Sequence, residues 1–269
     1  MIARLLILSL CAIAAIPAWA QQAAGPPVDV TALAKEQQNP ISSLTSIPLQ
    51  FNFDTGGGLE DQTSLLLNAQ PVIPFRVSSG WNAISRTVVP IASLPGPEDT
   101  RQSGVGDIQL QLYLTPSKAR GVIWGAGPVV SAPTATTAGL ETGSWAIGPT
   151  FVALAMPGPW VVGTLVNNVW TISDAGDDRK VNQFLLQPFV NYNLAKGWAI
   201  ASVPIITANW EADSGQEWTV PLGLSISRTT VFSGRPMVLG LHYYHNVVHP
   251  DTAASSQLRF MVVLLFPKR

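Results

Sequence analysis

The chain has 269 residues, a formal net charge of −1 at pH 7 and only 12% charged side chains. This near-neutral balance argues against a nucleic-acid partner. The one cysteine, Cys11, falls in a leading segment that is predicted to be removed, so neither a disulfide framework nor a cysteine-based metal site is expected.

The first twenty residues have the pattern of a secretory signal peptide. Arg4 supplies the positive start, residues 5–16 form an apolar core, and Ala18-Trp19-Ala20 gives a cleavage site before Gln21. The apolar run is shorter than the ~20 residues that a membrane-spanning helix needs. Residue 10 is leucine where a lipid-attachment motif requires a small residue, so lipidation of the cysteine is not expected. Residues 1–20 are therefore predicted to be a signal peptide.

Residues 21–46 differ from the rest of the chain and predict a periplasmic, plug-like segment. Thr31 is the expected cap of a short helix over Ala32–Gln38, which Pro40 would end. A disordered tail and a segment folded into a lumen both remain open. Because so short a helix is marginal in water by itself, we expect 28–44 to lie within or across the periplasmic mouth of a barrel.

Beyond this segment, residues 47–269 alternate apolar and polar side chains with period two, which predicts about twelve strands. Mean hydropathy is positive (+0.26), yet no apolar run past residue 20 approaches the length of a membrane-spanning helix. The expected fold class is all-β: a membrane-spanning, antiparallel, up-and-down β-barrel. The predicted strands are Leu49–Thr55, Thr63–Val77, Trp81–Ala92, Gly106–Thr115, Val122–Ala132, Ser144–Met156, Trp160–Ile172, Val181–Asn193, Trp198–Trp210, Glu217–Arg228, Met237–Val247 and Ser256–Phe266.

The predicted connections alternate between long polar loops and short turns, as in outer-membrane barrels. Acidic residues gather in the long set and basic residues in the short set, which predicts an acidic outer rim and a basic periplasmic rim. Both termini would then be periplasmic, in the outer membrane of a Gram-negative bacterium. The acidic set is Asp54, Glu60, Asp61, Glu98, Asp99, Glu141, Asp174, Asp177, Asp178, Glu211, Asp213 and Asp251, and the basic set is Lys118, Arg120, Lys196, Arg235, Lys268 and Arg269.

Tryptophans fall near predicted strand ends. Trp81, Trp160 and Trp198 open strands after short turns, and Trp210 closes one before a long loop. Indoles favour the membrane interface, so these four are expected to form an interface girdle. Trp124, Trp145 and Trp170 are less clearly terminal, and some could be core residues of a sandwich.

Proline recurs inside the predicted strands, where it removes a ladder donor. Bulges at these positions would accommodate the proline rings. The positions are Pro71, Pro74, Pro90, Pro128, Pro149, Pro188, Pro204 and Pro221.

The last strand, Ser256–Phe266, is expected to close the barrel against the first. Its apolar residues share one face, and Phe260 and Phe266 are the candidate closure aromatics. Arg259, the only charge in the run, falls on the other face.

Polar side chains on the opposite faces of the strands are candidate lumen residues. Twelve strands lie between small filled barrels and wide porins, which predicts a narrow or plugged conduit. Alternatively, these residues only satisfy one another in a closed interior. They are Gln50, Asn52, Asn68, Gln70, Arg76, Arg86, Asp107, Gln109, Gln111, Gln183, Gln187 and Asn191.

No enzymatic motif, metal site or cofactor site is indicated by the sequence. His242 and His245 fall on opposite faces of one strand, and no G-x-S-x-G elbow occurs. The alternatives to a channel are a structural barrel without transport, a membrane-embedded hydrolase with a Ser–His pair, and a soluble β-sandwich.

A family resemblance covers nearly the whole mature chain. It rests on the stretches at 35–50 (KEQQNPISSLTSIPLQ), 70–74 (QPVIP), 81–87 (WNAISRT), 122–128 (VIWGAGP), 216–221 (QEWTVP) and 258–268. Together these resemble a family of bacterial outer-membrane barrels labelled transporters, some members of which are called neuromedin U. The group is similar to the barrels of the phenol-degradation MetA pathway. The resemblance implies a barrel in contact with outer-membrane lipid and, by analogy, small hydrophobic or aromatic cargo. Cargo identity and oligomeric state stay open.

Overall fold

The computed structural model of the protein describes residues 29–57, 62–96, 100–119, 121–137, 139–140, 142–172 and 180–267. The predicted signal peptide lies outside these residues. So do eight of the predicted acidic rim residues and three of the basic ones, namely Glu60, Asp61, Glu98, Asp99, Glu141, Asp174, Asp177, Asp178, Arg120, Lys268 and Arg269.

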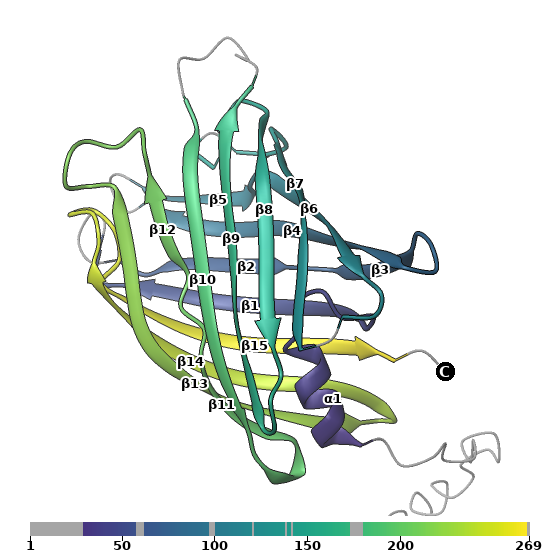
Figure 1. The fold of residues 1–269 in the computed structure, drawn as a ribbon. Helices are drawn as coiled ribbons and strands as arrows, with labels where there is room; N and C mark the ends of the chain where they lie inside the picture. The colour runs from purple at the N-terminus through teal and green to yellow at the C-terminus, as the bar shows by residue number, and fades with distance from the viewer. Residues whose placement is uncertain are drawn as a thin grey trace, which may run out of the picture.

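One antiparallel sheet closes on itself into a barrel of twelve strands (Figure 1), which confirms the predicted fold class. None of the helices among the described residues is long and apolar enough to cross a membrane. The segments are β1 (Thr45–Thr55), β2 (Ser64–Ala69), β3 (Val72–Arg76), β4 (Trp81–Pro95), β5 (Arg101–Val105), β6 (Ile108–Pro116), β7 (Val122–Ala132), β8 (Ala146–Ala155), β9 (Trp160–Thr171), β10 (Asn182–Asn193), β11 (Trp198–Ser202), β12 (Ile206–Asn209), β13 (Trp218–Phe232), β14 (Arg235–Val248) and β15 (Ser256–Phe266).

Three of the twelve strands are interrupted, which is why the sheet contains fifteen segments. β2 and β3 are separated at Gln70–Pro71, β5 and β6 at Gly106–Asp107, and β11 and β12 around Pro204. The sequence predicts a loop between the strands that end at Ala92 and begin at Gly106, and this is partly wrong, because the end of β4 and all of β5 lie in that interval and pair with each other. Polar strand ends that extend into water lack the apolar alternation by which strands are recognised.

The predicted short turn 229–236 is also wrong in length. β13 and β14 continue to a two-residue turn at Ser233–Gly234, both with positive φ (47° and 75°). Two successive positive φ values suit the right-handed twist of a tight hairpin. The turn is therefore set by backbone conformation at two residues, while the polar residues around it stay in the ladder.

Bulges explain only some of the in-strand prolines. The register shifts beside Pro221, and also near Pro90, because Val88 lies opposite Gln109 whereas Ile91 lies opposite Val105. Elsewhere the register continues without an inserted residue, as at Pro128, which lies directly opposite Pro149. These prolines remove ladder donors but do not displace the strand.

The outer wall is apolar. On β13, Leu222, Leu224 and Ile226 are 59%, 65% and 47% exposed, while the alternate residues of this strand point inward. The outward leucines of β6 repeat the pattern. So much exposed apolar surface on a closed barrel is the surface that lipid tails cover. The sheet therefore has the outer face of a membrane-spanning barrel.

Exposed indoles lie at both ends of this wall. At the short-turn end, Trp81 stands edge-on to Trp124 with ring centroids 6.0 Å apart. At the long-loop end, Trp210 stands edge-on to Trp218 at 5.3 Å. Trp160 and Trp198 open β9 and β11 at the short-turn end, and Trp145 and Trp170 lie at the long-loop end. An indole in this position can place its ring in lipid and its N–H in water.

The seam between the first and last strands runs the full length of both. Thr45 lies opposite Phe266 at one end of it and Thr55 opposite Ser256 at the other. In the middle, Phe51 and Phe260 lie side by side on the outer face, with ring centroids 6.2 Å apart. β1 thus has a neighbouring strand along both edges, β15 on one side and β2 and β3 on the other.

We expect Phe266→Ala to lower the yield of folded barrel, measured as the heat-modifiable band on a gel. The ring covers the outer face of the seam at the last paired position. Phe232→Ala is the matched control, because Phe232 is an exposed ring at the same rim but belongs to the β13–β14 hairpin. Equal yields from the two variants would remove any special role for the terminal aromatic.

The helix α1 (Val30–Gln37) lies at the short-turn end, the end at which β15 finishes (Figure 1). Its cap is Asp29, whose Oδ1 accepts hydrogen bonds from Thr31 N and Ala32 N at 3.0 Å each. The predicted cap, Thr31, is therefore wrong, and the helix begins two residues earlier than predicted. An aspartate satisfies the free N–H groups of the first turn and complements the helix dipole.

Candidate functional site

The lumen contains two spaces, one lined by strand and loop residues and the other mainly by inward-facing strand residues. The outer vestibule has a volume of about 780 Å³ and is bounded by β9, β10, β12, β13 and the loops beyond them. Gln109, Asn167 and Gln183 contribute amides to its wall. Its rim carries the carboxylates of Glu211, Asp213, Glu217 and Asp251. A solute from the long-loop side meets this acidic, amide-lined space first.

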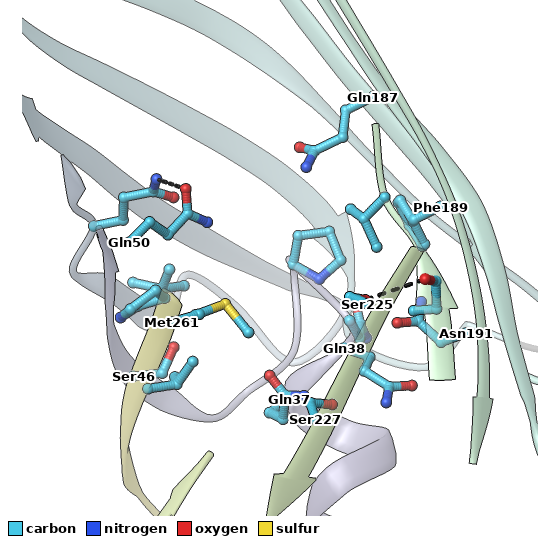
Figure 2. Close-up of a pocket in the computed structure, with 18 of the residues that line it drawn as sticks. Gln37, Gln38, Ser46, Gln50, Gln187, Phe189, Asn191, Ser225, Ser227 and Met261 are labelled. Carbon is cyan, nitrogen blue, oxygen red and sulfur yellow. Dashed lines mark hydrogen bonds between the residues drawn. The ribbon is translucent and has the colours of Figure 1, made fainter. Parts of the chain in front are cut away.

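The inner cavity has a volume of about 170 Å³ and lies deeper in the barrel. Figure 2 shows Gln50 and Met261 on one side of it, and Gln187 and Phe189 on the other. Its floor is not barrel wall but the end of α1 and the stretch that follows it, including Gln37, Gln38, Asn39, Pro40 and Ser42. The N-terminal segment therefore lies inside the mouth at the short-turn end.

Apolar packing holds this segment in place. Ile41 is 4% exposed and belongs to the main lumen cluster, with Phe189 and Leu165. Its Cδ1 lies only 3.2 Å from the position that a Cβ on Gly125 would take, so the glycine makes room for it. On the other side, Leu33 and Leu44 pack in a second buried cluster with Val238, Val263 and Leu265.

Polar bonds to the short turns complete the docking. Lys35 Nζ donates to the carbonyl oxygens of Met156 (2.9 Å) and Gly158 (2.7 Å) in the β8–β9 turn. The amides of Gln38 and Asn193 bond each other twice, at 3.0 Å in both directions. These contacts tie the segment to β8, β9 and β10, far from the strand into which it leads.

A chain of side-chain hydrogen bonds crosses the inner wall from β1 to β6. Gln70 donates to Gln50 (3.0 Å), and Arg86 donates through Nη2 to Gln70 (2.6 Å) and through Nη1 to Gln111 (3.3 Å). The Tyr113 hydroxyl also donates to Gln111 at 2.7 Å. Gln111 donates in turn through Nε2 to Gln109 Oε1 at 2.7 Å, so five residues that the sequence placed in the lumen form one connected network. Its only formal charge is the guanidinium, which is bound by amide oxygens.

A second guanidinium, that of Arg259, lies on the seam. It is 5% exposed, and it donates through Nε to Asn52 Oδ1 (2.6 Å) and through Nη2 to Gln257 Oε1 (2.7 Å). Gln257 in turn donates to Asp54 at 2.7 Å. The carboxylate therefore reaches this arginine only through an amide. The Arg259 guanidinium carbon also lies 5.8 Å from the centre of the Tyr244 ring.

His242 lies beside this arginine and lines the same inner cavity. It is 6% exposed, yet neither Nδ1 nor Nε2 has a hydrogen-bond partner among the described residues. Buried polar atoms are normally paired, so an unpaired imidazole facing a cavity requires an explanation. Alternation had placed Arg259 on the lumen face, but it gave no sign that this histidine would share the site.

The predicted lumen residues lie at different places in the barrel. Five line the inner cavity (Gln50, Gln70, Arg86, Gln187, Asn191), and two line the vestibule (Gln109, Gln183). Asn52 and Gln111 are buried in the wall, and Asn68 lies opposite Gln50 in the β1–β2 register. Arg76 and Asp107 line neither space: Arg76 is an exposed residue of the short-turn rim, and Asp107 lies at the other rim.

Asp107 is a loop anchor. Its Oδ1 accepts from Thr134 N and Ala135 N at 2.9 Å each, and its Oδ2 accepts from Thr142 N (2.7 Å) and Thr142 Oγ1 (2.5 Å). One carboxylate thus fixes both ends of the long β7–β8 loop above β6. Charged hydrogen bonds to backbone N–H groups are among the stronger ones in proteins.

The two histidines of β14 bear on the hydrolase alternative. His242 has no hydrogen-bonded serine among the residues that the structure describes, while His245 Nδ1 and Ser256 Oγ lie 3.2 Å apart on the outer wall. Among the described residues, no acid hydrogen-bonds the other nitrogen of His245, and no group of three His, Cys, Asp or Glu is placed to hold a metal ion. A Ser–His pair without an orienting group lacks the arrangement that activates a nucleophile.

Comparisons with known proteins identify the fold. No family model matches the chain, and no curated protein matches it either. Among solved structures, it is similar to an outer membrane channel from Pseudomonas putida F1, with a TM-score of 0.65 and 15% identity over 83% of this chain and 96% of that one. It is also similar to the NanC porin, with a TM-score of 0.52 and 10% identity over 82% and 100%. Both likenesses span whole barrels, and at these identities they show the architecture.

Proposed function

We propose that the protein is an outer-membrane channel for small molecules. The observation that carries this proposal is a closed wall that is apolar outside and lined inside by both amides and apolar side chains, with the outer vestibule lying above a separate inner cavity. A purely structural barrel has no need of such spaces. The two similar structures, a channel and a porin, support the proposal by analogy.

The conduit is narrow, and the N-terminal segment restricts it at the periplasmic end. Apolar side chains such as Val72, Leu165 and Phe189 line the inner cavity beside its amides. That mixed lining supports cargo with an apolar part, in line with the small hydrophobic or aromatic compounds that the family resemblance implies. Contact with outer-membrane lipid is provided by the outer wall.

The test is single-channel recording from the purified mature barrel in a planar bilayer. Discrete openings that disappear when the protein is heat-unfolded before addition are expected. A correctly folded barrel, judged by heat modifiability, that never conducts any ion or small solute would favour a structural role instead.

Topology gives a second test, because the long loops are proposed to face the exterior. The mature chain has no cysteine, so single cysteines report without background. Ser214 is exposed and lies in the loop between β12 and β13, which makes it a suitable labelling site on the long-loop side. Ser214→Cys should label on intact cells with an impermeant thiol reagent, and Lys118→Cys, in the β6–β7 turn, should label only after lysis. The reverse pattern would invert the barrel.

A further inference from the structure

We infer that the inner cavity is a binding site for a small carboxylate with an apolar body of about single-ring size. The inference rests on the proposed channel function for the ligand's route of entry. Binding itself can be measured without transport, so the two proposals can fail separately.

Within the described part of the chain, neither guanidinium of the cavity has a charged partner in direct contact. Arg86 donates to Gln70 and Gln111, and Arg259 donates to Asn52 and Gln257, all of them amide oxygens. Burying a charge among neutral groups costs free energy that an opposite charge offsets. These bonds use Nη1 and Nη2 of Arg86 and Nε and Nη2 of Arg259, so each guanidinium retains donors for a ligand. An arginine fork is also the geometry that suits a carboxylate.

His242 supplies the second and independent observation. It lines the same cavity and is only 6% exposed. Neither ring nitrogen has a hydrogen-bond partner among the described residues. A neutral imidazole always carries one N–H donor. Because His242 lies opposite Arg259 in the β14–β15 register, a carboxylate held by that arginine would be within reach of the imidazole.

The rest of the lining fits an apolar body rather than a bare ion. Leu165 and Phe189 line the cavity from β9 and β10, and Val203 and Met261 add further apolar surface to its wall. The volume of about 170 Å³ is close to that of a cavity that accommodates one benzene ring, about 150 Å³. A chloride ion would leave most of this space empty, and a multi-ring compound would exceed it.

Calorimetric titration of the folded barrel in detergent tests the inference with three probes. Benzoate should bind saturably, whereas benzamide, its neutral isostere, and acetate, the carboxylate without a ring, should bind at least about tenfold more weakly, since each lacks one recognised part. If benzamide binds as tightly as benzoate, the site does not recognise the charge. If acetate binds as tightly as benzoate, the site does not recognise the ring. An absence of saturable benzoate binding overturns the inference.

Variants locate the site. Arg86→Gln should weaken benzoate binding by about 10- to 100-fold, and His242→Leu by about 3- to 10-fold, as expected for losing a charged and a neutral hydrogen bond. His245→Leu is the matched control, because His245 faces outward on the same strand, and it should bind like the parent protein. If His242→Leu also binds like the parent, the cavity is not the site. Channel openings recorded in parallel show whether the proposed function stands when binding fails.

Discussion

Deleting residues 21–43 should give a folded barrel whose openings are larger or more frequent than those of the full-length protein. The deletion removes the floor of the inner cavity and the Ile41 side chain from the lumen cluster. The wall keeps its ladder because β1 begins at Thr45 and its pairs with β15 are retained. Side chains fill eight-stranded barrels, but a barrel of twelve strands is wider, so an unplugged lumen should conduct at least about twofold more.

The matched control deletes only residues 21–28. It leaves the Asp29 cap, the docking bonds of Lys35 and the amide pair between Gln38 and Asn193 in place. This shorter deletion should conduct like the full-length protein. A double variant, Lys35→Ala with Gln38→Ala, should lie between the two, with more frequent openings of the larger size as the segment undocks. If the long deletion conducts like the parent protein, the segment does not restrict the channel.

Period-two alternation predicted the wall of the barrel because a strand side chain has only two directions in which to point. A row such as Leu110, Leu112 and Leu114 must face lipid if Gln109 and Gln111 face the lumen, and the structure shows this arrangement. The same rule placed Arg259 inside. A one-residue slip would have reversed every side chain, so the apolar pattern fixes the register strongly.

The alternation of apolar and polar residues shows which face a side chain is on, but not its position along the barrel axis. The predictions of lumen residues were least accurate for this reason. Arg76 and Asp107 were assigned to the lumen by their face, but they lie at opposite rims. Height depends on the stagger between strands, which the backbone register sets and the side-chain pattern does not. The hydrogen-bond network could not be predicted from the sequence either. Arg86 contacts Gln70 and Gln111 only because the register aligns three neighbouring strands.

The helix cap shows a different limitation. Thr31 and Asp29 are both good capping residues, and sequence alone could not choose between them. The choice depends on where the following residues pack: Leu33 and Ala34 must be buried at the barrel mouth, which sets the phase of the helix. Tertiary contact therefore decides the start of a helix too short to be stable alone.

Replacing Asp107 with alanine should release the β7–β8 loop at both ends. One carboxylate holds the amides of Thr134, Ala135 and Thr142 as well as the Thr142 hydroxyl. Hydrogen bonds to a charged group contribute about 1.5–3 kcal/mol each, so losing even one of them should raise exchange of the freed amides about tenfold or more. Hydrogen–deuterium exchange of residues 133–143 is the measurement.

Asp107→Asn is the informative companion, because an amide keeps one acceptor oxygen and replaces the other with a donor. The side chain can then hold either the Thr134–Ala135 pair or the Thr142 amide, but not both. Exchange should therefore rise at one end of the loop and stay slow at the other, whereas alanine should free both ends. Beyond Ile108, whose N–H donates to Thr134 Oγ1 at 2.9 Å, β6 and β7 pair through a backbone ladder, so their other amides should exchange as slowly as in the parent protein. If all three loop amides stay protected in Asp107→Ala, then the loop is held by its other bonds, such as Thr137 Oγ1 to the Ser103 carbonyl at 2.9 Å, and the carboxylate is not its anchor.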